Sequence, residues 1–155
     1  MKKIIKMKIG KLERRNKMAL SNLGNFIIDS NGTKLSDAFN QVKGAIKDLN
    51  RNYWDMRRDN TIGNDDYFHC KGNFEATQRG VYGEKTAELL GDVKENYDYY
   101  KNRLVKGLSV IDAYADYLHD KDVNLQGRQQ AKSGLYNRAK DACIYKRVNG
   151  INEKY

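Results

Sequence analysis

Proline is absent from this chain of 155 residues, and cysteine and histidine occur only twice each. Because proline interrupts helix interiors, its absence permits long unbroken helices. Two cysteines are too few for the multi-bridge framework of a small disulfide-rich domain. The sequence also lacks a long uncharged apolar run and has a negative mean hydropathy, so no segment is a candidate for a membrane-spanning helix. These absences favour a globular domain that is stabilised mainly by a hydrophobic core.

Basic charge is concentrated at the beginning of the chain. Of the formal net charge of +9, residues 1–17 contribute +7, from eight basic side chains and one acidic one. We therefore separate a basic leader, residues 1–17, from a single domain, residues 18–155. Lysines interrupt the apolar residues of the leader, so it does not resemble a standard signal peptide. It could be an arm that binds phosphate or anionic lipid, an export signal, or a non-native addition if translation starts at Met18.

Apolar residues recur at spacings of three and four along most of the chain, which is the pattern of amphipathic helices. The pattern predicts an all-α fold, a single domain of about four or five helices. The expected helices span residues 34–56, 66–78, 84–106, 109–118 and 122–145. Gly127 and Gly134 weaken the prediction of the last one, because glycine is a poor helix former.

Local turn signals mark the ends of these helices. Ser109 precedes an apolar run with Asp112 three residues later, which is typical of a capped helix start. Gly80 and Gly83 bracket a turn before the helix expected at residues 84–106. A glycine-containing helix start can bind anions, but the spacing of these two glycines is common in ordinary turns, and we interpret it as structural.

The two cysteines leave two possibilities open. Cys70 and Cys143 could form one disulfide if the protein reaches an oxidising compartment. We favour the alternative, in which they are two small buried thiols.

The segment from Asp66 to Ala76 contains the densest group of chemically active side chains. On a helix, Asp65 and Asp66 precede His69 by four and three residues, so either carboxylate could orient the imidazole. Glu75 could act as a general acid if it were buried. His69 and Glu75 are therefore the candidate catalytic residues, although capping and ordinary surface positions explain them at least as well. Whether the chain is an enzyme stays open.

A candidate binding surface surrounds His69. We place Asp66 and Arg79 near it, and we expect Asn124 and Arg128, which share a helix face, to approach from the last helical region. The chain has neither an HExxH nor a CxxC motif, so we expect no metal site and no cofactor.

An acidic row is expected on the helix that begins near Ser109. Asp112, Asp116 and Asp120 follow one another at spacings of four and share a face. Cation binding is conceivable there, but we favour a solvated acidic ridge.

Three blocks carry a family resemblance: DYFHCKGNFEATQRGVYGE (66–84), LLGDVKENYD (89–98) and ADYLHDKDVNLQGR (115–128). Together they resemble the variable C-terminal domains that follow Rhs/YD-repeat shells in bacterial polymorphic toxins, and stand-alone relatives of these domains. The chain departs from that pattern at Phe74, where such domains often have another cysteine, and in having Cys143 as the only cysteine near its end.

The resemblance implies a secreted bacterial effector or toxin that acts in interbacterial competition or on a host. Its expected partners are a cognate immunity protein, a chaperone or a component of a secretion apparatus. It would reside in the bacterial cytoplasm before export and then be secreted or delivered into a target cell. The alternative function is a non-enzymatic binding module in which residues 1–17 bind nucleic acid or anionic membrane.

Overall fold

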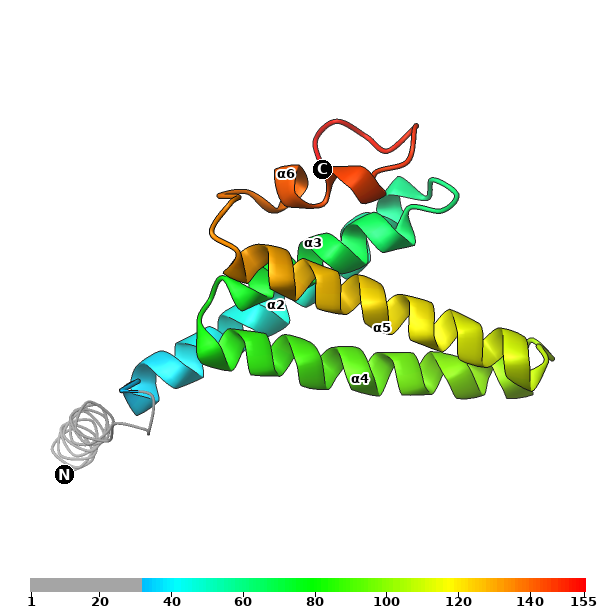
Figure 1. Ribbon diagram of the computed structural model, residues 1–155, viewed down its shortest axis with the longest axis horizontal. Coiled ribbons are helices and arrows are strands. Elements are labelled where there is room, and N and C mark those ends of the chain that lie inside the picture. Colours follow the sequence, from blue (N-terminus) through cyan, green and yellow to red (C-terminus); the bar gives the residue numbers. More distant parts are fainter. Residues whose placement is uncertain (1–31) are drawn as a thin grey trace, which may run out of the picture. The chain divides into compact units, whose positions relative to one another are not determined.

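The structure, a computed structural model, describes residues 32–155, and these are predominantly helical with no β-strand (Figure 1). The four long helices are α2 (Leu35–Asp59), α3 (Asp65–Thr77), α4 (Val81–Leu104) and α5 (Val110–Lys132). A short helix α6 (Ala139–Ala142) and a 3-10 turn η1 (Ile144–Lys146) follow. The predicted all-α fold is confirmed. The leader and Met18 lie outside the described residues.

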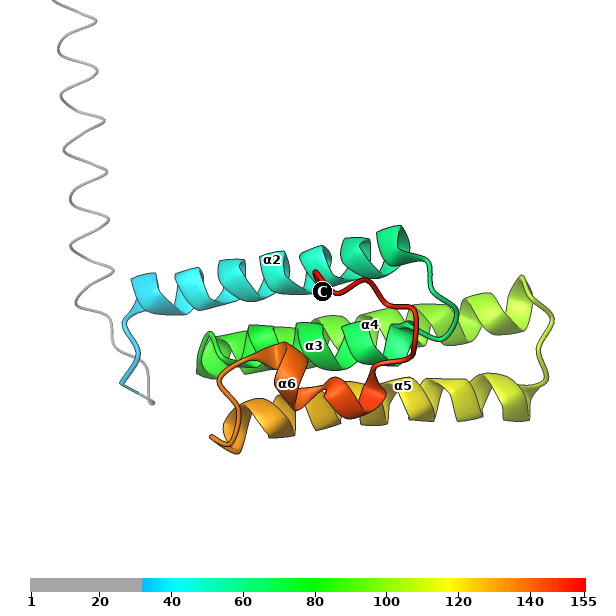
Figure 2. The ribbon, with the colours of Figure 1, turned by 90° about the horizontal axis from the view of Figure 1, so that it is seen from above.

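Residues 41–155 form one compact unit, to which the following description is confined. Within it, α4 and α5 run side by side as an antiparallel pair, as both views show (Figures 1 and 2). Helix α3 packs against both of them, and α6 and η1 pack against α3. None of the described helices is long and apolar enough to cross a membrane.

The main hydrophobic core lies around α3. Tyr67, Phe68 and Phe74 are almost completely buried, and Val123 of α5 packs into the same cluster. The C-terminal segment completes it with Ala139, Ala142, Cys143, Ile151 and Tyr155. A smaller cluster of Ala45, Ala76 and Ala87 joins α2, α3 and α4. Alanines at all three positions allow these helices to approach closely.

Cys70 and Cys143 form a disulfide inside the main core, with an S–S distance of 2.02 Å and both residues fully buried. Our favoured interpretation, two free buried thiols, is therefore wrong. Their 73-residue separation in sequence gave no reason to expect that the C-terminal segment returns to α3.

Helix α5 is continuous through Gly127, which corrects the predicted helix boundaries. The helices expected at residues 109–118 and 122–145 are instead one helix that ends at Lys132. A Cβ atom on Gly127 would overlap the carbonyl oxygen of Cys70, so the glycine is required where α5 crosses α3. Gly83 has the same role between α4 and α3, where a Cβ would overlap the carbonyl oxygen of Ala76.

The predicted start of α5 is confirmed. The Ser109 hydroxyl accepts a hydrogen bond from the Asp112 backbone N–H at 3.0 Å, and it donates one to the Asp112 carboxylate at 2.6 Å. Both bonds satisfy groups in the first turn, where a helix has no internal partners for its N–H groups.

The apolar stripes that predicted α2 and α4 are not buried along their whole length. On α4, Val93, Tyr97 and Leu104 are all exposed to solvent. Several polar side chains are buried instead, namely Asp48, Asn52, Asn73, Glu95, Asn102 and Asn124. Most buried polar groups in proteins have a hydrogen-bond partner, and here Asn73, Asn124 and Glu95 bond to one another, so the interior of this unit contains a side-chain network in addition to its apolar clusters.

Candidate functional site: a pocket with a charged end

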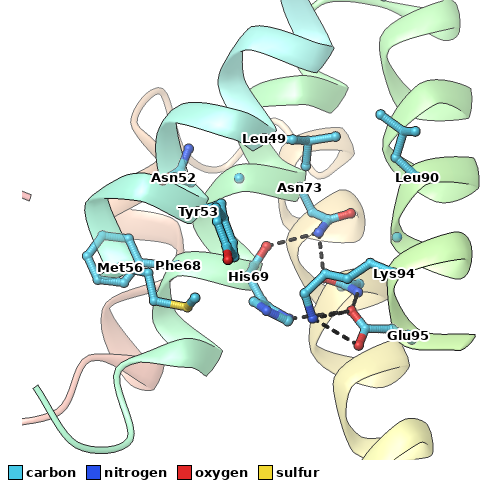
Figure 3. Close-up of a pocket in the computed structure, with 13 residues that line it drawn as sticks. Leu49, Asn52, Tyr53, Met56, Phe68, His69, Asn73, Leu90, Lys94 and Glu95 are labelled. Atoms are coloured by element: carbon cyan, nitrogen blue, oxygen red, sulfur yellow. Dashed lines mark hydrogen bonds and ion pairs between the residues drawn. The ribbon is translucent and has the colours of Figure 1, made fainter. Parts of the chain in front are cut away.

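A pocket of about 100 Å³, partly open to solvent, is lined by side chains of α2, α3, α4 and α5 (Figure 3). Its walls are apolar at one end, where Leu49, Tyr53, Met56, Phe68 and Leu90 line it. They are polar at the other end, where His69, Asn73, Lys94, Glu95 and Asn124 line it. The pocket therefore combines an apolar surface with converging polar groups, which is the usual composition of a ligand site.

Glu95 is at the centre of the polar end, and only 1% of its surface is exposed. Its carboxylate lies 3.8 Å from Nδ1 of His69 and 3.2 Å from the Lys94 ammonium (Figure 3). It also accepts a hydrogen bond of 3.0 Å from the Asn124 amide. Lys94 also contacts Asp98 at 2.9 Å. The Lys94 ammonium therefore balances the buried negative charge, and the Asn124 amide donates a hydrogen bond to it, as a buried carboxylate requires.

The pKa values of three side chains around Glu95 are shifted by their surroundings: His69, Lys94 and Asp120 of α5, whose carboxylate lies close to both His69 and Glu95. Burial, and then the neighbouring Lys94 charge, lower the pKa of His69, so its imidazole is neutral near pH 7. Burial, and then the adjacent Glu95 carboxylate, raise the pKa of Asp120 to about 8. Burial opposes the charge of Lys94, but Glu95 and Asp98 more than compensate for it and raise the pKa of Lys94.

Hydrogen-bonded amide side chains connect His69 and Glu95 to α5. The Asn73 amide donates to Asn124 Oδ1 at 2.6 Å and to the His69 carbonyl at 3.0 Å, and the Arg128 guanidinium donates to Asn73 Oδ1 at 3.2 Å. Asn124 and Arg128 therefore do approach the His69 region, and Asn73 joins them. The network fixes the side chains at the polar end of the pocket.

Glu75 and Arg79 lie elsewhere. Glu75 accepts hydrogen bonds from Arg51 at 2.7 Å and Asn52 at 2.5 Å, and Arg79 makes two bonds to Asp48, at 2.7 and 3.0 Å. The Glu75 contacts join α3 to α2, and the Arg79 contacts join the turn after α3 to α2. They do not include His69, so the structure does not assemble the proposed catalytic pair of His69 and Glu75.

Asp66 is also directed away from His69. Its carboxylate pairs with His119 at 2.9 Å and with Lys146 at 3.4 Å. The expectation that Asp66 orients the imidazole of His69 is therefore not met, because α5 supplies the histidine that Asp66 binds.

Sequence reasoning missed the two carboxyl groups that do lie beside His69. Glu95 was not singled out, and Asp120 was assigned to a solvated acidic ridge. The ridge interpretation is wrong for Asp120, which lies in the half-buried group with His69 and Glu95. A polar residue buried by a helix distant in sequence leaves no local pattern, so only the contacts between helices identify it.

Comparison with known proteins identifies the family. The family model described as serum amyloid A protein matches residues 36–155. This chain belongs to the serum amyloid A family. A serum amyloid A protein of Notamacropus eugenii is 33% identical over 119 residues, which cover 77% of this chain and 80% of that relative.

Other serum amyloid A proteins match over shorter lengths. The protein of Bos taurus is 37% identical over 90 residues, which cover 58% of this chain and 69% of the relative. Serum amyloid A-1 protein of Homo sapiens is 47% identical over 62 residues, or 40% of this chain. The match spans about half, 48%, of that human protein.

Membership of this family overturns the resemblance to Rhs-associated toxin domains. The three blocks that carried the resemblance all lie within the serum amyloid A match at residues 36–155. They were short, and none was tied to a catalytic function. The bacterial effector or toxin function is therefore wrong, together with the immunity, chaperone and secretion-apparatus partners and the bacterial localisation. The named relatives are proteins of animals that are called serum amyloid A.

The alternative function is not supported either. It rested on the basic residues 1–17, which lie outside the family match and outside the described residues. Binding of nucleic acid or anionic membrane by this leader has no support from the family.

Proposed function

We propose that this member of the serum amyloid A family binds phospholipid-covered particles through an apolar face of its helices. The observation that carries the proposal is the exposed apolar stripe on α4, where the exposed fractions are 60% for Val93, 67% for Tyr97 and 81% for Leu104. Soluble monomers seldom leave a large contiguous apolar surface in water unless it binds something.

The apolar surface continues from α4 to α2 across the pocket. Leu90 belongs to the α4 stripe and lines the pocket opposite Leu49 and Tyr53 of α2 (Figure 3). Next to Tyr53, the Trp54 side chain is half exposed. Both helices therefore present apolar side chains on the side where the pocket opens.

The energetics favour a lipid surface as the ligand. Fully burying one large apolar side chain contributes about 1.5–3 kcal/mol, so a few of them acting together can hold a helix in the interfacial layer of a phospholipid surface. This attraction does not depend on charge. The proposal therefore differs from an electrostatic arm, whose binding is lost in salt.

The disulfide supports an extracellular location, which we include in the proposal. Disulfides such as Cys70–Cys143 persist in secreted proteins and are rare in the reducing cytosol. The name of the relatives, serum amyloid A, points to the same compartment.

Binding to phosphatidylcholine vesicles tests the proposal. Trp54 is the only tryptophan of the chain and lies beside the proposed surface, so its fluorescence should shift to the blue when vesicles are added. The double variant Val93→Asp/Tyr97→Asp should bind about 10-fold more weakly or worse, because two apolar contacts are replaced by charges. Leu135→Asp is the matched control, since Leu135 is 78% exposed but lies after α5, outside this surface.

The control variant should bind within about twofold of the unchanged protein, and raising the salt from about 0.1 to 0.5 M should not weaken binding. An equal loss in both variants, or binding that disappears in salt, would contradict an apolar lipid-binding face on α4.

A further inference from the structure

Three helices each bring one metal-ligating side chain together beside the pocket, whose polar end is lined by two of them, His69 and Glu95. His69 belongs to α3, Glu95 to α4 and Asp120 to α5, and one potential ligand atom from each lies within 4.8 Å of the other two. We propose that these three side chains bind a divalent transition-metal ion of the Zn²⁺ type. This proposal is independent of the lipid-binding function.

The ligand set suits such an ion. Zinc is bound by histidine nitrogen and carboxylate oxygen at about 2.0–2.2 Å, and three protein ligands leave a fourth position for water. In a tetrahedral site these distances place the ligand atoms about 3.3 Å apart. His69 Nδ1 and Glu95 Oε1 are already 3.8 Å apart, and the Asp120 ligand atom lies within 4.8 Å of both, so the three ligands have to move closer together to close the site.

Lys94 would have to give up its contact with Glu95, and the structure provides an alternative partner for it. The Lys94 ammonium lies 2.9 Å from Asp98, which is closer than its 3.2 Å distance from Glu95. Asp98 is one helical turn further along α4, so Lys94 can keep a compensating carboxylate while Glu95 binds the ion.

Outer hydrogen bonds hold one of the three ligands, Glu95, in place. The Asn124 amide donates to Glu95 Oε1 at 3.0 Å, and Asn73 in turn donates to Asn124 at 2.6 Å. Metal sites normally have such outer hydrogen bonds, which orient the ligating carboxylates. The open pocket that His69 and Glu95 line supplies both a path for the ion and space for a water ligand.

A second group, formed by Asp66, His119 and Asp120, shares one carboxylate with the proposed site. We favour the His69 group because the ligands of the other are already occupied. The His119 ring is bonded to Asp66 at 2.9 Å, and the Lys146 ammonium lies 3.4 Å from the same carboxylate. The His119 side chain is also 54% exposed, so water competes with an ion there.

Zinc titration of the chelator-treated full chain by calorimetry and NMR tests the proposal. The chain has only two histidines, so their ring signals identify the bound one directly. We expect one Zn²⁺ per chain and a shift of the His69 ring signals, with the His119 signals nearly unchanged. Excess Mg²⁺, which prefers an all-oxygen octahedral site, should not displace the zinc.

Three variants locate the site. His69→Ala should weaken zinc binding more than about 100-fold, beyond the 10–100-fold that outer residues usually contribute. Glu95→Gln keeps the shape of the side chain but removes its charge, and it should also weaken binding at least about 10-fold. His119→Ala is the matched control and should change affinity by less than about twofold.

Two results would overturn the proposal: the absence of saturable zinc binding, or binding that is lost in His119→Ala and retained in His69→Ala. Melting curves show whether each variant is folded. If His69→Ala does not fold, the histidine ring signals of the unchanged protein still show which site binds zinc. A zinc-induced shift of the His69 signals supports the proposed site, and a shift of the His119 signals alone contradicts it.

Discussion

Two regions of the same helical unit are held together in different ways. The disulfide end, defined as α3 with residues 139–155, has buried aromatic side chains and the Cys70–Cys143 bond. In the α4–α5 arm, defined as residues 97–118, only Asn102 and Ala113 are buried. Large apolar side chains point outward in the arm, and Leu104 and Ile111 are about four-fifths exposed.

This difference shows that an amphipathic pattern specifies a helix without specifying what covers it. At the disulfide end the apolar residues contact one another. In the arm, a hydrogen bond of 2.6 Å between Asn102 and Asp116 joins α4 to α5. Within α5, the rings of Tyr114 and Tyr117 stack with their centroids 5.9 Å apart. We infer that the disulfide end supplies most of the stability and that the arm is available for binding.

The largest effect is expected from Phe74→Ala at the disulfide end. Phe74 is completely buried in the main core, so its removal should lower the free energy of unfolding by about 4 kcal/mol. Tyr97→Ala in the arm is the control and should cost less than about 0.5 kcal/mol, because Tyr97 is 67% exposed. Urea denaturation measures both, and equal losses would remove the distinction between the two regions.

Removing the disulfide should have the next largest effect. The double substitution Cys70→Ala/Cys143→Ala should cost about 3 kcal/mol, because the bond closes a long loop in the unfolded chain. Hydrogen exchange should increase most in residues 139–155 and least in the arm. A uniform increase along the chain would show that the two regions unfold as one.

A smaller effect is expected inside the arm. Asn102→Ala leaves the Asp116 carboxylate without its interhelical donor and should cost about 1.5 kcal/mol. Asn96→Ala is a matched control on the same helix, since the exposed Asn96 amide only donates to the carbonyl of Asp92, and it should cost less than about 0.5 kcal/mol. Similar losses in thermal melts would mean that the buried amide does not hold the arm together.

The smallest effect concerns pH at the boundary between the regions. Burial and the Glu95 carboxylate raise the pKa of Asp120 to about 8, above its value of about 3.9 in an unfolded chain. The folded protein therefore binds more protons than the unfolded one between these values, and Asp120 makes the stability fall as the pH rises toward 8. In metal-free buffer, the loss of stability between about pH 7 and 9 should be smaller in Asp120→Asn. An unchanged pH profile in that variant would show that Asp120 is not the titrating group.

The sequence predicted the helices well because helix periodicity is local. Four long helices and the cap at Ser109 are confirmed. The break expected between residues 118 and 122 was wrong, because α5 is continuous from Val110 to Lys132. Gly127, which weakened the prediction of a helix there, serves a crossing with α3 that no local pattern reveals. The disulfide was not favoured for the same reason, since it depends on the return of the C-terminal segment to the core.

The candidate site was predictable only in part. The concentration of reactive side chains drew attention to His69, which does line the pocket. Its partners Glu95 and Asp120 come from α4 and α5, and their burial is a product of packing between helices. Glu75 and Arg79 are close to His69 in sequence, but they form hydrogen bonds with side chains of α2 instead.

The position of the Cys70–Cys143 bond has a consequence for the integrity of the molecule. Residues 70–143 form a covalent ring that contains the whole of α4 and α5. If a protease cuts the exposed turn between α4 and α5, the two fragments therefore remain linked to each other. The nicked molecule would migrate as one species on a gel until a reductant separates it into two.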